Sequence, residues 1–411
     1  MGMVHCRIWA GAWVLCVLKS CVRIDDLLAG YSQVVRIVHI SDCYAPRLGG
    51  IETQVRALAM RQVVQGHDVH VITATPSPSV RNGSELLDGV QVHRVTARMP
   101  ADLPVHPRVV KEVRAALGSG GVAGGADAVH VHGGVVSPFA YPAAKVARAL
   151  GLPTVVTIHG VWGGVFSPLA RFADTVTSWT SWGVALTAVS DAAAEPIRRI
   201  VGPGVPVTLV PNGIDVDQWR VHPVAGDPRE LRLVAVMRLA PRKRAVPLVQ
   251  MVQRAARQLP AGHRIRLVVV GNGPLESRVR RTIDTSLTNC SVDLVGRLTP
   301  DAVRSTLASS DAFIAPALLE SFGIAALEAR TAGLPVLAYA ATGISSFVRN
   351  GVEGLLASSD EQMVANIARL AIDGDVRMQI AEHNRTTEPV ESWPNVLDMV
   401  QQAYARAAAL A

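Results

Sequence analysis

Residues 316–335 read PALLESFGIAALEARTAGLP and join an apolar strand to a helix. Residues 313–315 form an apolar run typical of the end of a buried strand. Residues 325–332 are mostly good helix formers, and the glycine and proline that follow favour the end of a helix. The segment therefore predicts a strand–turn–helix junction, with Glu320 in the loop and Glu328 on a face of the helix.

A helix that begins within residues 321–324 presents unpaired N–H groups and the positive end of its dipole to the space beyond the strand, which favours an anion. Gly323 relaxes the backbone at this turn. Ionised carboxylates at Glu320 and Glu328 can each accept hydrogen bonds from the vicinal hydroxyls of a sugar or ribose. The alternative interpretation is an ordinary junction with two solvated acids.

The composition indicates two α/β domains. A chain of 411 residues exceeds what one hydrophobic core usually fills. Hydrophobic residues make up 49% and aromatic residues only 4%, so the cores are aliphatic, as in parallel sheets covered by helices. The net charge of +7 favours anionic partners. No zinc spacing, RNA-binding signature or helix-turn-helix pattern is present, so nucleic acid is not expected as a partner.

The first 34 residues stand outside this pattern. Residues 8–18 are an apolar run between Arg7 and Lys19, too short to span a bilayer and without a cleavage site directly after it. We interpret residues 1–34 as a non-native or disordered extension, with the first strand opening at Val35. The five scattered cysteines favour reduced thiols in a cytoplasmic protein.

The first half of the chain alternates strands with helices. A strand over residues 37–41 is followed by Gly49-Gly50 and a helix, and a strand over residues 67–73 completes a right-handed βαβ unit. Strands over residues 128–132 and 154–160 place His132 and His159 at their carboxyl ends, where open parallel sheets bind ligands. His159, which precedes a glycine, is the better functional candidate, and a structural role is expected for His132.

A turn and a linker separate the halves of the chain. The turn Pro211-Asn-Gly-Ile-Asp215 is followed by Asp217, a D-x-D spacing that we interpret as loop because nothing nearby completes a metal shell. The Pro- and Gly-containing residues 221–229 then form a linker. We therefore predict one domain over residues 35–220 and a second over residues 221–391.

The second half repeats the alternation and opens with a cluster of cations. The strand over residues 231–236 precedes Arg238, Arg242, Lys243 and Arg244. At the carboxyl edge of a sheet such a cluster could neutralise a diphosphate, although most such clusters are solvated loops. A later strand ends in Gly271-Asn-Gly273, but Glu276 stands where a dinucleotide fingerprint needs its third glycine, so a nicotinamide cofactor is not expected.

Taken together, these motifs resemble the retaining glycosyltransferases of family 4, which have the GT-B fold of two Rossmann-like domains facing across a cleft. The matching residues are Gly49-Gly50-Ile-Glu52, His159-Gly160, Pro211-Asn-Gly-Ile-Asp215, Arg238 and Lys243, Gly271-Asn-Gly273, and Glu320 and Glu328 with Phe322-Gly323 between them. The resemblance runs from about Arg36 to the last helix. It implies a first domain that binds the acceptor, a second that binds a nucleotide-sugar donor, and a C-terminal helix, residues 392–411, that crosses back to the first.

The resemblance also implies roles for individual residues. It assigns catalysis to His159, Arg238, Lys243 and Glu320, and donor binding to Gly50, Gly271, Gly273, Ser321, Phe322, Gly323, Ile324 and Glu328. The two cations would hold the diphosphate and stabilise the leaving phosphate. Glu328 would bind the ribose, while Glu320 and His159 would contact the sugar. No metal or other cofactor is expected, since the cations and the helix dipole would neutralise the diphosphate.

Several positions depart from the family pattern. Arg244 follows the lysine where the family often has glycine, and Ala317 replaces a frequent serine. Ser345 and Ser346 stand where many members have a glutamate, which leaves the sugar specificity open. The resemblance implies retention of anomeric configuration and a hydroxyl acceptor that is a lipid, a glycan or a small molecule.

Two alternatives remain open at this point. One is a catalytically inactive nucleotide-sugar-binding protein of the same fold. The other concerns location: Arg108, Lys111 and Arg114 are spaced for one helix face beside valines, which is usually a solvated stripe but would also suit a peripheral contact with the inner face of the membrane.

Overall fold

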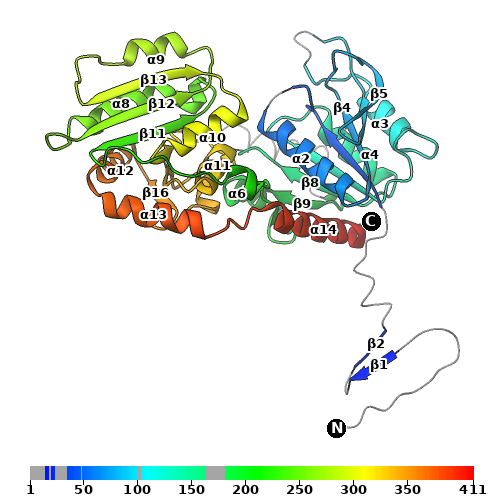
Figure 1. The fold of residues 1–411 in the computed structure, drawn as a ribbon. Coiled ribbons are helices and arrows are strands. Elements are labelled where there is room, and N and C mark those ends of the chain that lie inside the picture. The colour runs from blue at the N-terminus through cyan, green and yellow to red at the C-terminus, as the bar shows by residue number, and fades with distance from the viewer. Residues whose placement is uncertain (1–13, 18–19, 24–34, 48, 100–102, 163–180) are drawn as a thin grey trace.

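The computed structural model describes residues 14–17, 20–23, 35–47, 49–99, 103–162 and 181–411. Two separate parallel-sheet domains lie side by side (Figure 1). In the N-terminal segment, β1 (Val14–Val17) and β2 (Ser20–Arg23) form an antiparallel pair. Most of residues 1–34 lies outside the described residues, so the interpretation of this segment as an extension stays a prediction.

The first domain is built on an eight-stranded sheet in the order β10-β9-β8-β7-β3-β4-β6-β5, in which only β5 and β6 pair antiparallel. Its strands are β3 (Arg36–Ser41), β4 (Asp68–Thr73), β5 (Gly83–Leu87), β6 (Val90–Arg94), β7 (Ala128–Gly133), β8 (Thr154–Ile158), β9 (Ala185–Ala188) and β10 (Val207–Leu209). The central strands are almost entirely buried, because helices cover both faces of the sheet.

The helices of the first domain divide between these two faces. They are α2 (Gly50–Val64), α3 (Val109–Leu117), α4 (Ala140–Ala149), α6 (Asp191–Val201), α7 (Val216–Trp219) and α14 (Trp393–Leu410). Val38 and Val131 pack with α3, α4 and α6, whereas Val155 packs with α2 and α14. Since successive strand residues alternate between faces, odd-numbered residues of β3 and β8 and even-numbered residues of β7 point toward α2 and α14.

The second domain is a six-stranded, fully parallel sheet in the order β13-β12-β11-β14-β15-β16. Its strands are β11 (Glu230–Val236), β12 (Arg264–Val270), β13 (Cys290–Gly296), β14 (Ala312–Ile314), β15 (Val336–Tyr339) and β16 (Gly354–Ala357). Its helices are α8 (Ala245–Ala256), α9 (Glu276–Thr282), α10 (Pro300–Ala308), α11 (Ile324–Thr331), α12 (Asp360–Ile372) and α13 (Gly374–Thr386), with 3-10 turns η3 (Pro241–Lys243) and η4 (Gly343–Ser346).

The C-terminal helix crosses back to the first domain, as the resemblance predicted (Figure 1). The Tyr404 hydroxyl accepts a hydrogen bond from Gln62 Nε2 at 3.0 Å, and Arg148 donates one to the Leu410 carbonyl at 3.0 Å. Among the described residues, no helix combines the length and the apolar character needed to cross a membrane.

The chain passes between the domains twice at one place. Ile214, on the way out, and Ser392, on the way back, form a parallel β-bridge. The Ile214 N–H donates to the Glu391 carbonyl at 2.9 Å, and the Trp393 N–H donates to the Ile214 carbonyl at 3.2 Å. The Arg61 guanidinium lies 4.3 Å from the centroid of the Trp393 ring, on the side of the first domain. The two crossings are therefore hydrogen-bonded to each other.

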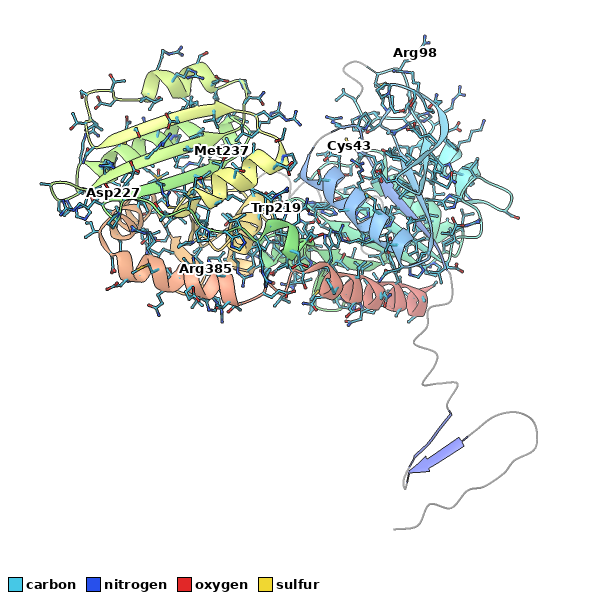
Figure 2. All side chains as sticks on the ribbon, in the orientation of Figure 1. Cys43, Arg98, Trp219, Asp227, Met237 and Arg385 are labelled. Carbon is cyan, nitrogen blue, oxygen red and sulfur yellow. The ribbon has the colours of Figure 1, made fainter. Side chains whose placement is uncertain are left out.

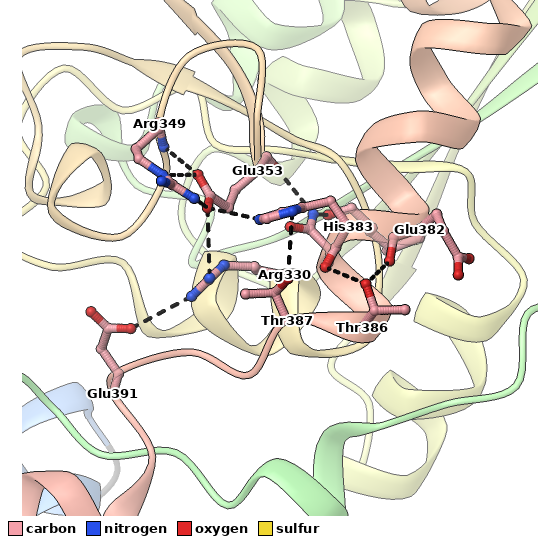
Figure 3. A network of polar contacts seen from close by, with 10 residues as sticks. Arg330, Arg349, Glu353, Glu382, His383, Thr386, Thr387 and Glu391 are labelled. Atoms are coloured by element: carbon pink, nitrogen blue, oxygen red, sulfur yellow. Dashed lines mark hydrogen bonds and ion pairs between the residues drawn. The ribbon is translucent and has the colours of Figure 1, made fainter.

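A cluster of buried ions lies against the returning crossing (Figure 3). Arg330 on α11 lies between Glu353, at 3.8 Å, and Glu391, at 3.6 Å. Arg349 and His383 also contact the Glu353 carboxylate, at 2.5 and 3.1 Å. Burial lowers the pKa of Arg330 and raises that of Glu391. Through Arg330, this cluster connects α11, the helix of residues 316–335, to the segment that leads into α14.

The domains also touch beside this crossing. One apolar cluster contains Ala193 and Ile197 of α6 together with Ile344 and Phe347 of the second domain. Trp219, at the end of α7, packs against the same cluster and lies at the junction of the two domains (Figure 2). The Ser190 hydroxyl, which caps α6, also donates to the Ser321 carbonyl.

Candidate active site

A cleft of about 610 Å³ lies between the carboxyl ends of the two sheets. Of the predicted site residues, Gly50, His159, Lys243, Glu320, Ser321, Phe322, Gly323 and Ile324 line it. Arg238, Gly271, Gly273 and Glu328 are not among the lining residues. The strand–turn–helix junction thus faces the first domain directly, and a Cβ atom added to Gly50 would lie 3.6 Å from Ile324 Cδ1.

The junction has the predicted geometry. β14 ends at Ile314, and α11 begins at Ile324 with Gly323 as its N-cap, at φ 92° and ψ 59°. A Cβ atom at Gly323 would lie 2.5 Å from Ile344 Cγ1, so glycine is required by the backbone and by the space. In the part of the chain that the structure describes, the N–H groups of Ile324 and Ala325 have no partner. Both residues line the cleft, which therefore contains a helix N-terminus suited to an anion.

Lys243 and Glu320 form an ion pair near the N-terminus of this helix. Lys243 Nζ lies 2.5 Å from Glu320 Oε2, and their side chains are 28% and 18% exposed. The Glu320 carboxylate balances the charge of Lys243 and fixes where its ammonium group points. An arriving anion would compete with Glu320 for Lys243, which leaves the carboxylate free to accept hydrogen bonds from hydroxyl groups.

The other cations of this loop have different environments. Arg238 is exposed, and its side chain has no partner within the described ranges. Arg242 is also exposed and lines the cleft, although the sequence singled out Arg238. Arg244 points away: its Nη2 lies 2.7 Å from Asp360 Oδ2 and its Nη1 lies 2.9 Å from the Tyr339 hydroxyl. Its φ of 57° is left-handed, a conformation that favours glycine, the residue that the resemblance led us to expect here.

Gly271 and Gly273 support this loop from behind. A Cβ atom at Gly271 would lie 1.9 Å from the Met237 carbonyl oxygen, and one at Gly273 would lie 2.5 Å from the Leu239 carbonyl oxygen. The Leu239 N–H donates to the Asn272 carbonyl at 2.9 Å. The two glycines thus allow the turn after β12 to pack closely on the loop that carries the cations.

Glu328 lies one turn into α11 and is largely buried. Its carboxyl group forms no hydrogen bond or ion pair with any residue described by the structure, whereas its backbone carbonyl accepts from the Ala332 N–H at 2.9 Å. Burial raises the pKa of its carboxyl to about 8, so the unliganded protein holds it mostly protonated at neutral pH. A buried acid without a partner, on the helix that opens into the cleft, is suited to a ligand that brings hydroxyl donors.

His159 lines the cleft on the side of the first domain. It follows β8, its N–H donates to the Gly133 carbonyl at 2.8 Å, and the residue as a whole is 9% exposed. Burial lowers its pKa to about 4, so the imidazole is neutral. Its Nε2 lies 3.1 Å from Nδ1 of His132, which is buried and does not line the cleft.

Three polar residues that line the cleft were not assigned individual roles from the sequence. Glu52, in the first turn of α2, and Asn212 both line the cleft, as does Arg242. Glu52 and Asn212 occur inside the two glycine-containing motifs quoted above, so their positions were signalled by the motifs. Asp215 caps α7 by accepting from the Gln218 N–H and pairs with Arg61 at 3.2 Å, in agreement with the loop interpretation of its D-x-D spacing.

The structure also shows the surroundings of the positions that depart from the family pattern. Ser345 donates to the Thr342 carbonyl at 2.7 Å within η4, and Ser346 accepts from the Asp191 N–H at 3.4 Å. Ala317 is 4% exposed. The two serines therefore take part in the turn and in the contact between domains.

Two family models and individual relatives match this chain. The model described as Glycosyltransferase Family 4 matches residues 48–218, and the model described as Glycosyl transferases group 1 matches residues 217–387. A glycogen synthase of Mycobacterium tuberculosis is 28% identical over 90% of this chain and 94% of its own length. The gpi3 subunit of the phosphatidylinositol N-acetylglucosaminyltransferase of Schizosaccharomyces pombe is 23% identical over 89% and 79%.

A solved structure has the same architecture. Anabaena HepE, crystallised with UDP and glucose, aligns with a TM-score of 0.65 at 17% identity, over 91% of this chain and 100% of its own. At this identity the likeness establishes the fold alone. The two adjoining family matches, the facing parallel-sheet domains and the returning C-terminal helix show that this chain is a glycosyltransferase of family 4 with the GT-B fold.

Proposed function

We propose that this glycosyltransferase moves a hexosyl group from a nucleotide-diphosphate sugar to a hydroxyl acceptor, with retention of configuration and without a metal ion. The observation that carries the proposal is the N-terminus of α11, which opens into the cleft beside Lys243 and opposite Gly50 and His159. It combines an anion site with hydroxyl-binding groups in one cavity of about 610 Å³, a volume typical of small-molecule sites.

The diphosphate is assigned to the end of α11. The unpaired N–H groups of Ile324 and Ala325, the helix dipole and Lys243 supply positive charge without a cation. Arg242 lines the same side, and Arg238 extends from the same loop. These groups stabilise the charge that grows on the leaving phosphate, which is where electrostatic help accelerates the reaction. Activity that EDTA leaves unchanged would support this assignment; loss of activity that Mg²⁺ or Mn²⁺ restores would refute it.

The sugar and the nucleoside lie on either side of the diphosphate in this proposal. Glu328 accepts hydrogen bonds from the ribose hydroxyls, since its unpaired carboxyl lies deeper along α11. Glu320, released from Lys243, and His159 contact the hexosyl group. Similar carboxylate–hydroxyl pairs hold the ribose in dinucleotide folds.

In the transfer step the bond between the anomeric carbon and the phosphate oxygen breaks, and its electron pair stays on the phosphate. The acceptor oxygen bonds to the same face of the anomeric carbon and gives its proton to the leaving phosphate. His159 is neutral and deeply buried, so the proposal does not use it as a nucleophile. An NMR assignment of the product anomer tests this step, and an inverted product would reject it.

Two of the relatives act on different kinds of acceptor. By their names, one relative builds glycogen and another glycosylates phosphatidylinositol. A lipid-linked acceptor is supported by Arg108, Lys111 and Arg114, which are exposed together with Val110 at the start of α3. Flotation with vesicles that contain anionic lipid tests this contact. The triple exchange of these cations to glutamine should abolish flotation, and a wild type that does not float removes the lipid surface.

A donor screen distinguishes transfer from mere binding. A donor that binds the native state raises the melting temperature with concentration. We expect one nucleotide-diphosphate sugar to stabilise the wild type and to be hydrolysed or transferred, with turnover lost in Lys243→Ala. Stabilisation without turnover for every acceptor would instead support a catalytically inactive sugar-nucleotide-binding protein.

A further inference from the structure

A continuous chain of buried hydrogen bonds connects the C-terminal helix to His159. The Tyr404 hydroxyl accepts from Gln62 Nε2 at 3.0 Å, and Gln62 Oε1 lies 2.7 Å from His39 Nε2. His39 Nδ1 lies 3.0 Å from His132 Nε2, and His132 Nδ1 lies 3.1 Å from His159 Nε2. These side chains come from α14, α2, the neighbouring strands β3 and β7, and the residue that follows β8, and together we call them the histidine chain.

The sequence pattern explains why these side chains meet. His39, His132 and His159 occupy positions of β3, β7 and the end of β8 that point to the face covered by α2 and α14. Parallel pairing aligns Ser41 with His132 and His132 with Thr157. The imidazoles therefore form one row between the sheet and these two helices.

The direction of each hydrogen bond follows from the amide of Gln62. Its Nε2 donates to Tyr404, so its oxygen must accept from His39 Nε2–H. A neutral imidazole that donates through one nitrogen accepts through the other, so His39 Nδ1 accepts from His132 Nε2–H. By the same rule, His132 Nδ1 accepts from His159 Nε2–H. His159 is thereby left with a bare Nδ1.

This remaining nitrogen is the one available to a ligand. His159 lines the cleft, and its Nδ1 makes no hydrogen bond to any described residue and is not among the buried unpaired polar atoms. We infer that Tyr404, Gln62, His39 and His132 are positioning residues that hold His159 in the Nε2–H tautomer, so that its Nδ1 accepts a hydrogen bond from a hydroxyl of the transferred sugar. The inference rests on the proposed function for the identity of that ligand, but the tautomer itself does not.

The histidine chain does not act as a proton path. A proton taken up at His159 would place a cation in a row of desolvated imidazoles that ends at an amide oxygen, and none of the hydrogen bonds that link the row involves a carboxylate. The burial that lowers the pKa of His39 and His159 to about 4 has the same consequence. His159 is therefore a neutral acceptor in this arrangement.

His130 extends the network sideways. Its Nδ1 lies 3.1 Å from the Tyr404 hydroxyl, and its Nε2 lies 2.7 Å from Thr157 Oγ1. Since the Tyr404 hydroxyl accepts from Gln62, its own proton is available to His130 Nδ1, and Tyr404 can serve both branches. Removing this one hydroxyl frees the Gln62 amide to turn over, which would reverse every bond in the histidine chain and put a proton on His159 Nδ1.

The test is the tautomer of His159 in the full-length protein, read from long-range 15N–1H spectra of histidine-labelled samples, with His159→Gln to assign the signal. We expect the Nε2–H form in the wild type and a mixture of both forms in Tyr404→Phe. Tyr44→Phe is the matched control, since the Tyr44 hydroxyl is buried in the same domain and has no partner. An Nδ1–H form in the wild type, or an unchanged tautomer in a folded Tyr404→Phe, would overturn the inference.

The kcat of Tyr404→Phe gives a second test, because kcat would not change if Tyr404 only stabilised the fold. We expect Tyr404→Phe to lower kcat about three- to tenfold, the worth of one neutral hydrogen bond, while the donor KM and the melting temperature change little more than in Tyr44→Phe. Equal kcat values in the two variants would contradict the positioning role, and failure of all variants to turn over any donor would instead count against the proposed function. Stoichiometric Zn²⁺ binding that displaces the bonds between His39 and His132 would overturn the histidine chain, because nitrogens of His39, His130 and His132 lie within 4.8 Å of one another.

Discussion

The unpaired carboxyl of Glu328 predicts a specific pH dependence of donor binding. Its pKa of about 8 means that the free protein holds it mostly protonated at pH 7, whereas the ionised form is the stronger acceptor for two ribose hydroxyls. Binding must therefore remove a proton. The apparent Kd of the donor should fall about tenfold per pH unit below pH 8, and about a hundredfold in total between pH 6 and pH 9.

Other groups should not mask this effect. The pKa values of His39 and His159 are lowered to about 4, and those of His130 and His132 lie well below their ordinary value, so these imidazoles stay neutral above pH 6. The phosphates of a nucleotide-diphosphate sugar are strong acids and do not titrate in this range. Glu328 is therefore the group expected to dominate the slope.

Isothermal titration calorimetry in buffers of different ionisation enthalpy measures both the Kd and the proton count. We expect release of about 0.9 protons per donor bound at pH 7. Glu328→Gln should bind the donor with a flat pH profile, about 10- to 100-fold more weakly than the wild type at pH 9 and about equally at pH 6. Glu388→Gln, an exposed acid of the same domain, is the control. A flat wild-type profile, or an unchanged slope in Glu328→Gln, would refute the reasoning.

Three further variants test the site. Lys243→Ala should lower kcat about 100- to 1,000-fold in single-turnover assays, because it removes a charge aimed at the leaving phosphate. Gly323→Ala should lower the free energy of unfolding in urea by about 2 kcal/mol, through its φ of 92° and the clash with Ile344; no loss would contradict the packing. Arg244→Ala should be less stable than Arg244→Gly by about 1 kcal/mol by the same measurement, because both lose the bonds to Asp360 and only alanine keeps a left-handed penalty.

The sequence correctly predicted the features that depend on local backbone conformation, namely the strands, the helices and the turns between them. The alternation of strands and helices predicted both parallel sheets, and the glycine and the apolar runs around residues 316–335 predicted the junction between β14 and α11. His159 was placed in the cleft because a strand end carries its residue to the edge of the sheet. The GT-B fold and the returning helix came from the resemblance and are both confirmed.

The sequence did not predict in which direction individual side chains point. Four cations follow β11, but the η3 turn decides that Arg242 and Lys243 line the cleft while Arg244 turns to Asp360. The raised pKa of Glu328 depends on burial of its carboxyl, which the sequence pattern does not indicate. His39 and His132 are 93 residues apart, so their contact depends on the pairing of β3 with β7.

The hydrogen-bonded pair of crossings at Ile214 and Ser392 has a mechanical consequence. Two adjacent tethers allow the lobes to bend about the line that joins them and resist rotation of one lobe about the long axis of the molecule. Any change in the angle between the lobes would therefore follow one angular coordinate. Along it, α11 and the end of β8 would approach and separate on a single arc, so Lys243 and His159 would return to the same relative position.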